Sequence, residues 1–515
     1  MLIKTYGAAV LGIDATLITI EVNSSKGCMF YLVGLPDAAV KESHRRILSA
    51  LQESGCRLPM TNLVINMAPA DIRKEGAAFD LPLAIGMLAA TEAMQDVEGR
   101  LNRFLLMGEL SLDGTLQPVK GVLPMAIKAR ELGFEGMIVP RANAREAAVV
   151  NHLAVYGVDN VREVVEFFNG KRTLEPTIVN TREEFFARQS QFDLDFSEVK
   201  GQENVKRALE VAAAGGHNIL LIGAPGSGKS MLAKRLPGIL PPLSLGESLE
   251  TTKIHSVAGK LGSEGGLIYK RPFRDPHHTI SMAAMTGGGN QPQPGEISLA
   301  HNGILFLDEL PEYNRSVLEV LRQPLEDRKI TVARVKYSVE YPASFMLVAS
   351  MNPCPCGYYN HPTKPCVCTP TQVQRYLNRI SGPLLDRIDL QIEVTPLPFE
   401  KMADARPGES SAAIRERVVQ ARRRQEKRYA GVPGVYCNAQ MNSRLLAQYA
   451  RPDEAGLAML KTAMTQLNLS ARAYDRILKV ARTIADIEGS DNIRPAHLAE
   501  AIGYRNLDRE DWAMK

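Results

Sequence analysis

A glycine-rich run at residues 223–230, GAPGSGKS, has the residue types and spacing of a phosphate-binding loop. It lies between an apolar run, 218–222, and an amphipathic stretch that begins at Met231, a pattern that predicts a strand, a turn and a helix start. Backbone N–H groups of such a loop close around phosphate oxygens, while Lys229 can reach the β- and γ-phosphates and the Ser230 hydroxyl can ligate Mg²⁺. The residues expected to bind the nucleotide are Gly223, Ala224, Pro225, Gly226, Ser227, Gly228, Lys229 and Ser230. We therefore expect the chain to bind a nucleoside triphosphate with Mg²⁺.

Two further apolar runs end in polar side chains that suit the same chemistry. Residues 304–307 predict a buried parallel strand that ends in Asp308 and Glu309. Asp308 would hold Mg²⁺ through water, and Glu309 would polarise the attacking water. Another buried strand, 345–351, ends at Asn352, which could orient that water, although asparagine before proline is also an ordinary turn residue. Combined with the phosphate-binding loop, the acid pair indicates nucleotide hydrolysis.

The composition is that of a globular protein with room for three or four domains. The chain has 515 residues, of which 45% are hydrophobic and 23% charged, with a formal net charge of +4. This mild excess neither establishes nor excludes nucleic acid, which usually meets a basic face. No run approaches the roughly 18 continuous apolar residues of a membrane span, and the first residues do not resemble a signal peptide. We expect a cytoplasmic protein without a membrane partner.

The order of the predicted elements divides the chain into four parts. Over 1–173, short strand-like runs alternate with helical patterns, which predicts a mixed α/β domain. Residues 174–195, which include Pro176 and several charges, predict a linker. The nucleotide-binding core is expected over 196–398, and helical patterns over 399–515 predict a C-terminal helical lid. The expected fold class is α/β: a P-loop core with a helical lid, preceded by a mixed α/β domain.

Four of the seven cysteines crowd into one loop, 354–368. They form two closely spaced pairs: Cys354, Cys356, Cys366 and Cys368. A turn between the pairs could bring four thiolates around one structural Zn²⁺, although C-x-C is tighter than the usual spacing of zinc ligands. His361 could replace one sulfur, and the alternative is a set of reduced structural thiols, which a reducing compartment favours over disulfides.

The motifs together resemble an AAA+ ATPase, and the core resembles the magnesium-chelatase-like branch, specifically the ComM/YifB family of bacterial proteins. The resemblance extends over the whole chain. Its most particular pieces are GAPGSGKSMLAKRLPGILPPL, FRDPHHTISMAAMTGGG, LFLDELPE, YPASFMLVASMNPCPCGYY and ISGPLLDRIDL.

This resemblance implies roles for two arginines. Arg387, in LLDRID, matches the arginine that such ATPases insert into the nucleotide site of the neighbouring subunit, and Arg472, in LSARA, matches the lid arginine known as sensor 2. Without the resemblance, Arg387 would be read as a surface arginine paired with an adjacent aspartate. An arginine that acts in trans implies that subunits abut in a ring, so a homo-hexamer is expected.

Three segments are candidates for contact with DNA. In related motors a hairpin at 331–340 points into the central channel, where Arg334 and Lys336 would face phosphates; a solvated hairpin is the alternative. The block 274–289, which ends in three glycines, is a second candidate for a channel loop. The stretch 415–428 is the most basic in the chain and predicts a solvated helix face, with a DNA-facing or subunit-bridging helix as the alternative.

The N-terminal domain resembles the protease domain of Lon, which uses a serine nucleophile activated by a lysine. Alignment of the motifs places Ala78 where the serine belongs and Leu123 where the lysine belongs, while Ser111 and Lys120 fall elsewhere in the pattern. Alanine carries no nucleophile and leucine carries no base. We therefore expect an inactive domain that serves as a scaffold or substrate adaptor.

Three functions compete for this chain. The resemblance favours a hexameric ATP-driven helicase that extends branched recombination intermediates, as in the uptake of transforming DNA. A chelatase-type ATPase that remodels a partner protein is the alternative, weakened because chelatase motor subunits are typically bare AAA+ modules. An ATP-dependent protease is disfavoured because the serine-lysine pair is missing.

Overall fold

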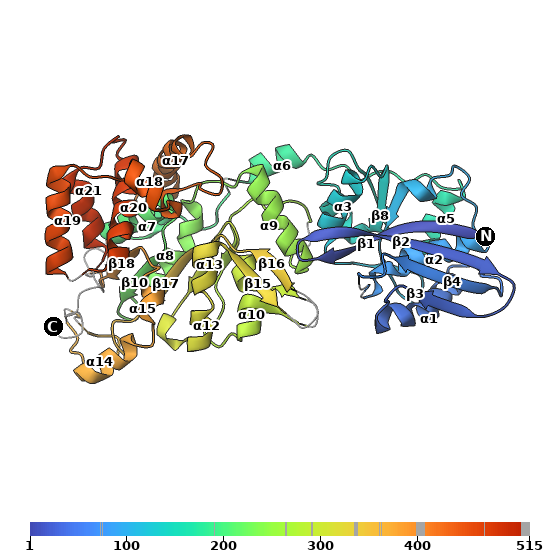
Figure 1. Cartoon of the computed structure of the whole chain (residues 1–515), viewed down its shortest axis with the longest axis horizontal. Helices are drawn as coiled ribbons and strands as arrows, with labels where there is room; N and C mark the ends of the chain where they lie inside the picture. Colours follow the sequence, from blue (N-terminus) through green and yellow to red (C-terminus); the bar gives the residue numbers. More distant parts are fainter. Residues whose placement is uncertain are drawn as a thin grey trace. The chain divides into compact units, whose positions relative to one another are not determined.

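The computed structural model describes residues 1–72, 74, 76–189, 191–262, 265–289, 292–333, 338–359, 361, 363–397, 407–467 and 469–505. These residues form two compact units (Figure 1). The first unit comprises Met1–Arg188 and Leu245–Tyr269, and the second comprises Gln189–Ser244 and the chain from Lys270 onward. The chain therefore passes between the units at three points.

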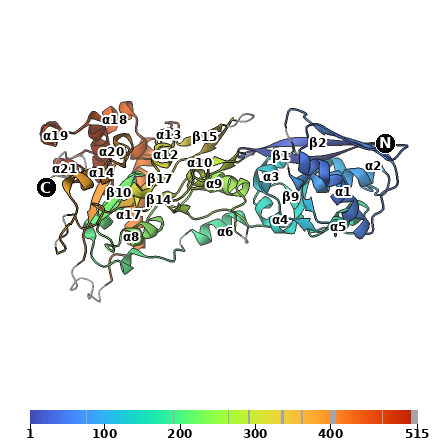
Figure 2. The same cartoon turned by 90° about the horizontal axis from the view of Figure 1, so that it is seen from below.

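A seven-stranded mixed sheet forms the first unit, in the spatial order β3-β4-β2-β1-β5-β8-β9. Its strands are β1 (Leu2–Leu11), β2 (Asp14–Ser25), β3 (Phe30–Val33), β4 (Asn62–Ala68), β5 (Phe104–Leu106), β8 (Gly136–Pro140) and β9 (Ala154–Val158), and a separate pair joins β6 (Glu109–Leu110) to β7 (Leu116–Gln117). β1 and β2 form a long antiparallel hairpin (Figure 2), in register from Leu2 opposite Asn23 to Leu11 opposite Asp14. Alternate residues of β2, Ile18, Ile20 and Val22, are fully buried, as the period of a half-buried strand requires.

The helices of the first unit include one that the sequence analysis assigned to the core. They are α1 (Ala38–Glu53), α2 (Asp80–Ala90), α3 (Val122–Glu131), α4 (Arg141–Ala147), α5 (Val161–Phe168), α6 (Thr181–Arg188) and α9 (Leu245–Val257). The Gly121 N–H donates to the Ser256 carbonyl at 3.1 Å, which fixes the end of α9 beside the start of α3. The structure thus differs from the expected division: α6 forms within the expected linker, and 245–269 joins the first unit.

A five-stranded sheet forms the second unit, in the order β11-β14-β17-β10-β18. Its strands are β10 (Ile219–Gly223), β11 (Phe273–Arg274), β14 (Ile304–Leu307), β17 (Met346–Met351) and β18 (Leu390–Val394). Every neighbouring pair is parallel, and β10, β14 and β17 are buried along their whole length. Because parallel strands place their carboxyl ends at one edge, the residues that follow Gly223, Leu307 and Met351 converge.

Helices and two short hairpins surround this sheet. They are α7 (Glu203–Gly215), α8 (Lys229–Arg235), α10 (Met282–Thr286), α11 (Glu296–Leu299), α12 (Arg315–Glu319), α13 (Arg322–Asp327), α14 (Pro370–Leu377) and α15 (Gly382–Leu385), with the pairs β12 (Gly287–Gly288)/β13 (Gln293–Pro294) and β15 (Lys329–Ala333)/β16 (Ser338–Pro342). The predicted helical lid follows as α17 (Ser411–Arg428), α18 (Ser443–Tyr449), α19 (Glu454–Gln466), α20 (Ala471–Ile487) and α21 (Pro495–Gly503). The predicted fold class is confirmed. Among the described residues, no helix combines the length and apolar character needed to cross a bilayer.

One buried carboxylate joins the lid to the core. Asp389, which directly precedes β18, is 1% exposed, and its Oδ1 accepts from Arg476 Nη1 of α20 at 2.8 Å. Its Oδ2 accepts from the N–H of Asn218, which directly precedes β10, at 3.1 Å and lies 3.4 Å from His217 Nδ1. Burial opposes ionisation, yet Arg476 and His217 hold the pKa of Asp389 well below its usual range.

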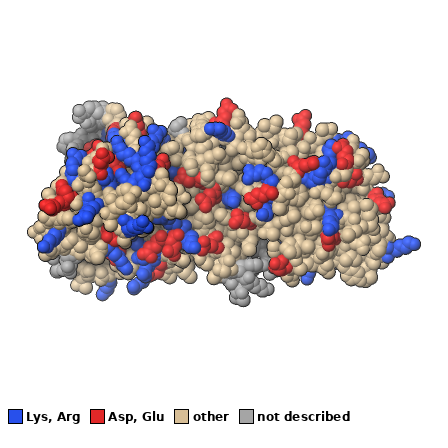
Figure 3. All heavy atoms as spheres, turned by 45° about the horizontal axis from the view of Figure 1, so that its top comes forward, with Lys and Arg blue, Asp and Glu red and all other residues tan. Residues whose placement is uncertain are grey.

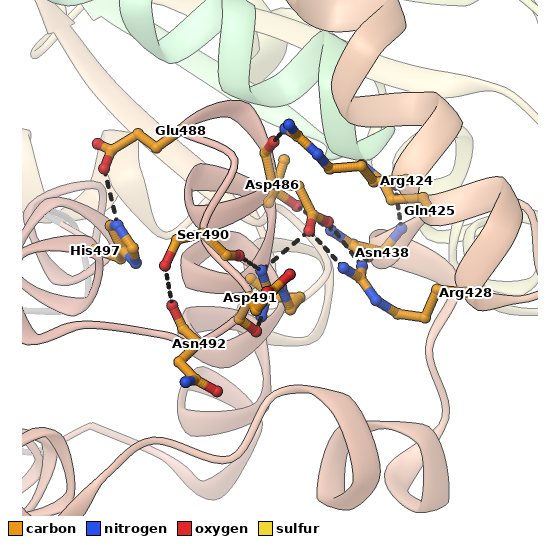
Figure 4. Close-up of polar contacts among 12 residues, drawn as sticks. Arg424, Gln425, Arg428, Asn438, Asp486, Glu488, Ser490, Asp491, Asn492 and His497 are labelled. Carbon is orange, nitrogen blue, oxygen red and sulfur yellow. Dashed lines mark hydrogen bonds and ion pairs between the residues drawn. The ribbon is translucent and has the colours of Figure 1, made fainter.

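The arginines of α17 are largely used inside the fold. Arg422 donates to the carbonyls of Ala213 and Ala214 at the end of α7, at 2.9 and 3.1 Å. Arg428 makes a bidentate ion pair with the buried Asp486 of α20, and Arg424 donates to the Asp486 carbonyl (Figure 4). Basic side chains still gather over the C-terminal helices, with acidic side chains among and beside them (Figure 3). Several arginines of the basic stretch 415–428 therefore stabilise the packing of α17 against α7 and α20.

Replacement of Asp486 should destabilise the lid strongly. Its carboxylate accepts from Arg428 at 2.5 and 2.7 Å and from Asn438 Nδ2 at 2.8 Å, and Arg482 lies 3.1 Å away. Asp486→Ala leaves these buried cations uncompensated, so we expect a loss of about 3–5 kcal/mol in chemical denaturation. Arg423→Ala, at an exposed position of α17, is the control and should stay within about 0.5 kcal/mol of the unaltered chain. Equal stability of the two variants would contradict the internal role of this cluster.

Candidate nucleotide-binding and catalytic site

The phosphate-binding loop connects the end of β10 to the start of α8. Gly226 and Gly228 have φ values of 78° and 94°, a left-handed conformation that glycine adopts without a steric penalty. The loop borders a cavity of about 350 Å³. The cavity is lined by Pro225, Gly226, Ser227, Gly228, Lys229, Ser230, Met231, Asp308, Glu309, Ser350, Met351 and Asn352. The structure therefore brings the loop, the acid pair and Asn352 together around one space.

Lys229 lies at the floor of this cavity and is 8% exposed. Its Nζ donates to the carbonyls of Gly223 at 2.7 Å and Ala224 at 3.0 Å, and to Asn352 Oδ1 at 3.2 Å. Burial lowers the pKa of Lys229, and the carboxylates of Asp308 and Glu309 oppose that shift. An ammonium so placed can donate to phosphate oxygens that enter the cavity.

Asp308 is hydrogen-bonded to the hydroxyl of Ser230, which is expected to ligate the same Mg²⁺ ion. Ser230 Oγ donates to Asp308 Oδ2 at 2.7 Å, and the Glu309 N–H donates to Asp308 Oδ1 at 3.0 Å. Ser350 Oγ also donates to Asp308 Oδ1. A hydroxyl and a carboxylate are the ligand types that Mg²⁺ takes beside nucleotide phosphates, so the residues fit this ion.

Sequence reasoning did not single out Ser350, although the residue is fully buried and lines the cavity. The available signal was its position: it is a hydroxyl near the end of an otherwise apolar strand. In the sheet Ser350 pairs with Leu221 of β10, so its side chain stands beside the phosphate-binding loop.

Glu309 has a left-handed backbone, with φ 55°, which directs it away from the continuation of β14. Its Oε2 lies 3.7 Å from His278 Nδ1, and the centroids of the His278 and His277 rings are 4.1 Å apart, with the ring planes tilted by 33°. The Tyr313 hydroxyl donates to the carbonyl of Pro276 and fixes this turn. The block 274–289, expected as a channel loop, thus begins beside the candidate catalytic carboxylate, and His278 is a second residue that the sequence analysis did not assign to the site.

The two arginines expected to contact nucleotide do not line the cavity of their own chain. Arg387 is 8% exposed; its Nη1 donates to the Pro383 carbonyl at 2.5 Å, and its Nη2 pairs with Glu326. Arg472 has a largely exposed side chain whose Nη1 donates to Asp386 Oδ2 at 3.1 Å. Their roles in nucleotide contact stay predictions.

The four cysteines of the loop converge. The sulfurs of Cys354, Cys356, Cys366 and Cys368 all lie within 4.8 Å of one another. Three of the separations are 3.3, 3.7 and 3.5 Å, close to the separation of about 3.8 Å that four sulfurs 2.3 Å from one zinc would have. His361 is not part of this group; its Nδ1 accepts from backbone N–H groups of its own turn. The donor set therefore fits a closed tetrahedral Zn²⁺ site.

The cysteine loop reaches the phosphate-binding loop. Gly357, with φ 85°, lies so close to Pro225 that a Cβ at this position would stand 2.5 Å from the proline ring. The cysteine loop is thus in direct contact with Pro225, a residue of the phosphate-binding loop.

Burial would raise the pKa of Cys356, but the N–H groups of Tyr358 and Val367 and the neighbouring thiols lower it to about 6.

The positions that correspond to a protease dyad are occupied by apolar side chains. Ala78 lies in a short helical turn, Ala77–Phe79, and Leu123 is fully buried in α3. The Leu123 N–H donates to Glu146 Oε1 at 3.0 Å, and Ser256 of α9 donates to the same oxygen. Neither position offers a nucleophile or a base.

Three family models match the chain. The model described as magnesium chelatase, subunit ChlI, matches residues 195–402; subunit ChlI of Mg-chelatase matches 20–143; and magnesium chelatase, subunit ChlI C-terminal, matches 408–505. The parallel sheet, the phosphate-binding loop and the acid pair define a magnesium-chelatase-like AAA+ ATPase, which implies ATP and Mg²⁺ as cofactors.

Similar proteins resolve the class further. Competence protein ComM of Haemophilus influenzae is 44% identical over 507 residues, which cover 98% of this chain and 97% of the relative. The uncharacterized protein YifB of Escherichia coli is 46% identical over 509 residues, 97% of this chain and 96% of the relative. Lon protease 2 of Bacillus subtilis is 28% identical over 163 residues, 28% of this chain and 27% of the relative. The chain belongs to the ComM/YifB family.

Changes at Lys229 and Glu309 should separate nucleotide binding from hydrolysis. Lys229→Ala removes a charged donor to the phosphates, so we expect about tenfold or greater weakening of ATP binding. Glu309→Gln retains the shape but not the base, so binding should persist while phosphate release falls about a hundredfold or more. Glu312→Gln is the control, because this carboxylate pairs with Arg379. Normal hydrolysis by Glu309→Gln would remove Glu309 from the mechanism.

The cysteine loop should bind one zinc ion. Protein purified without chelator should contain about one zinc per chain, and Cys356→Ser should lower both the zinc content and the thermal stability. Cys28→Ser, which removes an exposed cysteine of the first unit, should change neither quantity. Metal-free protein with full thermal stability would show that the thiols serve packing alone.

Proposed function

We propose that this protein is an ATP-hydrolysing hexameric motor that acts on DNA in the cytoplasm, as a helicase that promotes branch migration in recombination or transformation. The observation that supports the proposal is a cavity lined by the phosphate-binding loop, the acid pair and Asn352, in a chain that is related over 98% of its length to a competence protein. Competence implies the handling of incoming DNA, and a motor is required wherever strands are moved against base pairing.

Within one subunit, the geometry supports a division of labour. Lys229 and the N–H groups of the phosphate-binding loop would hold the β- and γ-phosphates, while Ser230 and Asp308 would hold Mg²⁺, which neutralises charge on the phosphates. Glu309 would accept a proton from the attacking water. Asn352, whose Oδ1 lies 3.2 Å from Lys229 Nζ, is near enough to orient that water.

The ring follows from the arginines. Arg387 would complete the site of the adjacent subunit, a role worth about 10³–10⁵ in rate for trans-acting arginines. Its position outside its own nucleotide cavity supports this assignment. Arg472 would act as the lid arginine after the lid moves from the arrangement in which Arg472 contacts Asp386.

Contact with DNA is assigned to the hairpin of β15 and β16. The register of its two strands runs from Lys329 opposite Pro342 to Ala333 opposite Ser338. Arg334 and Lys336 fall in the sequence between these strands and lie outside the described residues. A two-stranded ribbon can present two cations to a polyanion without sequence readout. The internal bonds of Arg422, Arg424 and Arg428 leave the α17 helix a weaker candidate.

A chelatase-like ATPase that remodels a partner protein is the second candidate. It is favoured by the chelatase-subunit models, one of which matches residues 20–143 of the N-terminal domain. That match weakens the expectation that a chelatase motor would lack such a domain. The two functions differ in the polymer that should stimulate hydrolysis.

Stimulation by DNA tests the proposal. We expect single-stranded or branched DNA to raise ATPase activity, and the double variant Arg334→Ala, Lys336→Ala to retain basal activity. Its slope of log affinity against log salt should flatten by up to about two units. Lys329→Ala, on the stem of the hairpin and paired with Glu340, should preserve the slope. If no DNA structure binds to the protein and none stimulates its ATPase activity, the remodelling function is favoured.

A further inference from the structure

A second cavity, of about 640 Å³, lies in the second unit beside Arg387. Residues of α10, α13 and β15 line it, together with the Arg387 side chain. β15 leads into the hairpin expected to contact DNA, and α10 belongs to the block that begins beside Glu309. The guanidinium of Arg387 is thus close to two elements that substrate binding would move.

Arg387 is held there incompletely. Its guanidinium donates to the Pro383 carbonyl and pairs with the Glu326 carboxylate, whereas its buried Nε makes no hydrogen bond to any described residue. A buried donor without a partner costs free energy. A guanidinium also keeps its charge at every physiological pH, so an anionic partner stabilises it wherever it is buried. In the isolated chain, Glu326 supplies that anion.

We infer that Glu326 is a latch that competes with the phosphates of the neighbouring subunit's nucleotide for Arg387; this rests on the proposed action of Arg387 in trans. In the latched position the guanidinium is withdrawn onto α13. In the engaged position, phosphate oxygens replace the carboxylate, and the planar donor set of arginine suits both partners. Glu326 is therefore a positioning residue, not a catalytic one.

The placement of Glu326 explains how substrate could release the latch. Glu326 lies on the short helix α13, and Arg328 alone separates that helix from β15. Displacement of the β15–β16 hairpin would therefore move the carboxylate relative to Arg387. Glu319 lines the same cavity but pairs with Arg322 at 2.8 Å, so it offers a matched carboxylate without a contact to Arg387.

Complementation in mixed rings tests the latch. The acceptor subunit carries Arg387→Ala and keeps its P-loop, while the donor carries Lys229→Ala and keeps its arginine. Hydrolysis then measures how well the donor supplies Arg387. Because Glu326 holds most Arg387 side chains in the latched position, a donor with Lys229→Ala and Glu326→Gln should restore about threefold more hydrolysis than the parent donor. The two donors are compared at equal incorporation into the rings. A donor with Lys229→Ala and Glu319→Gln should match the parent.

Each other outcome overturns a defined statement. Equal or lower recovery with the Glu326→Gln donor, while the parent donor restores hydrolysis, would refute the latch and leave the trans action of Arg387 intact. No recovery with the parent donor in stable mixed rings would overturn the trans action and the latch together. Glu326→Asp, which keeps the charge but shortens its reach, replaces Glu326→Gln if that donor fails to fold, and it should also exceed the parent.

Discussion

The nucleotide site depends on the ion pair between Asp389 and Arg476, because this pair fixes three elements at once. Asp389 directly precedes β18, accepts a hydrogen bond from the residue that directly precedes β10, and pairs with Arg476 in the first half of α20. Removal of either partner would leave an uncompensated buried charge, which typically costs about 3–5 kcal/mol. The strand that leads to the P-loop, the segment that carries Arg387 and the lid helix that carries Arg472 therefore meet at one carboxylate. A displacement of any one of these three elements would change the contacts that Asp389 makes with the other two.

Much of the site could be predicted from the sequence because parallel strands end at a common edge. Three buried apolar runs followed by GAPGSGKS, Asp308 and Asn352 leave little freedom once the strands are parallel. Ser350 and His278 could not be predicted in this way. Their contacts with Asp308 and Glu309 depend on strand register and on the path of a turn, neither of which composition records.

The basic stretch of α17 shows a different limit of sequence reasoning. A count of arginines predicts an exposed charged face, but it does not include backbone carbonyls, which also accept hydrogen bonds from guanidinium groups. Arg422 and Arg424 bind carbonyls that face them from α7 and α20, and Arg428 binds a buried carboxylate. The convergence of the four cysteine sulfurs was easier to predict, because four thiols within fifteen residues cannot lie far apart once the loop turns back.

The segment 245–269 belongs to the first unit, although it lies in the sequence between two segments of the second unit. It leaves the second unit after Ser244, packs its helix α9 against α3 of the first, and returns at Lys270. Neither unit is thus a contiguous stretch of chain, and no single cut of the chain divides one unit from the other. An ATPase fragment that starts after the N-terminal domain would retain α9 without α3, against which it packs, and an N-terminal fragment would leave α3 without α9. Any split of this chain that preserves the first unit must keep residues 245–269 together with residues 1–188.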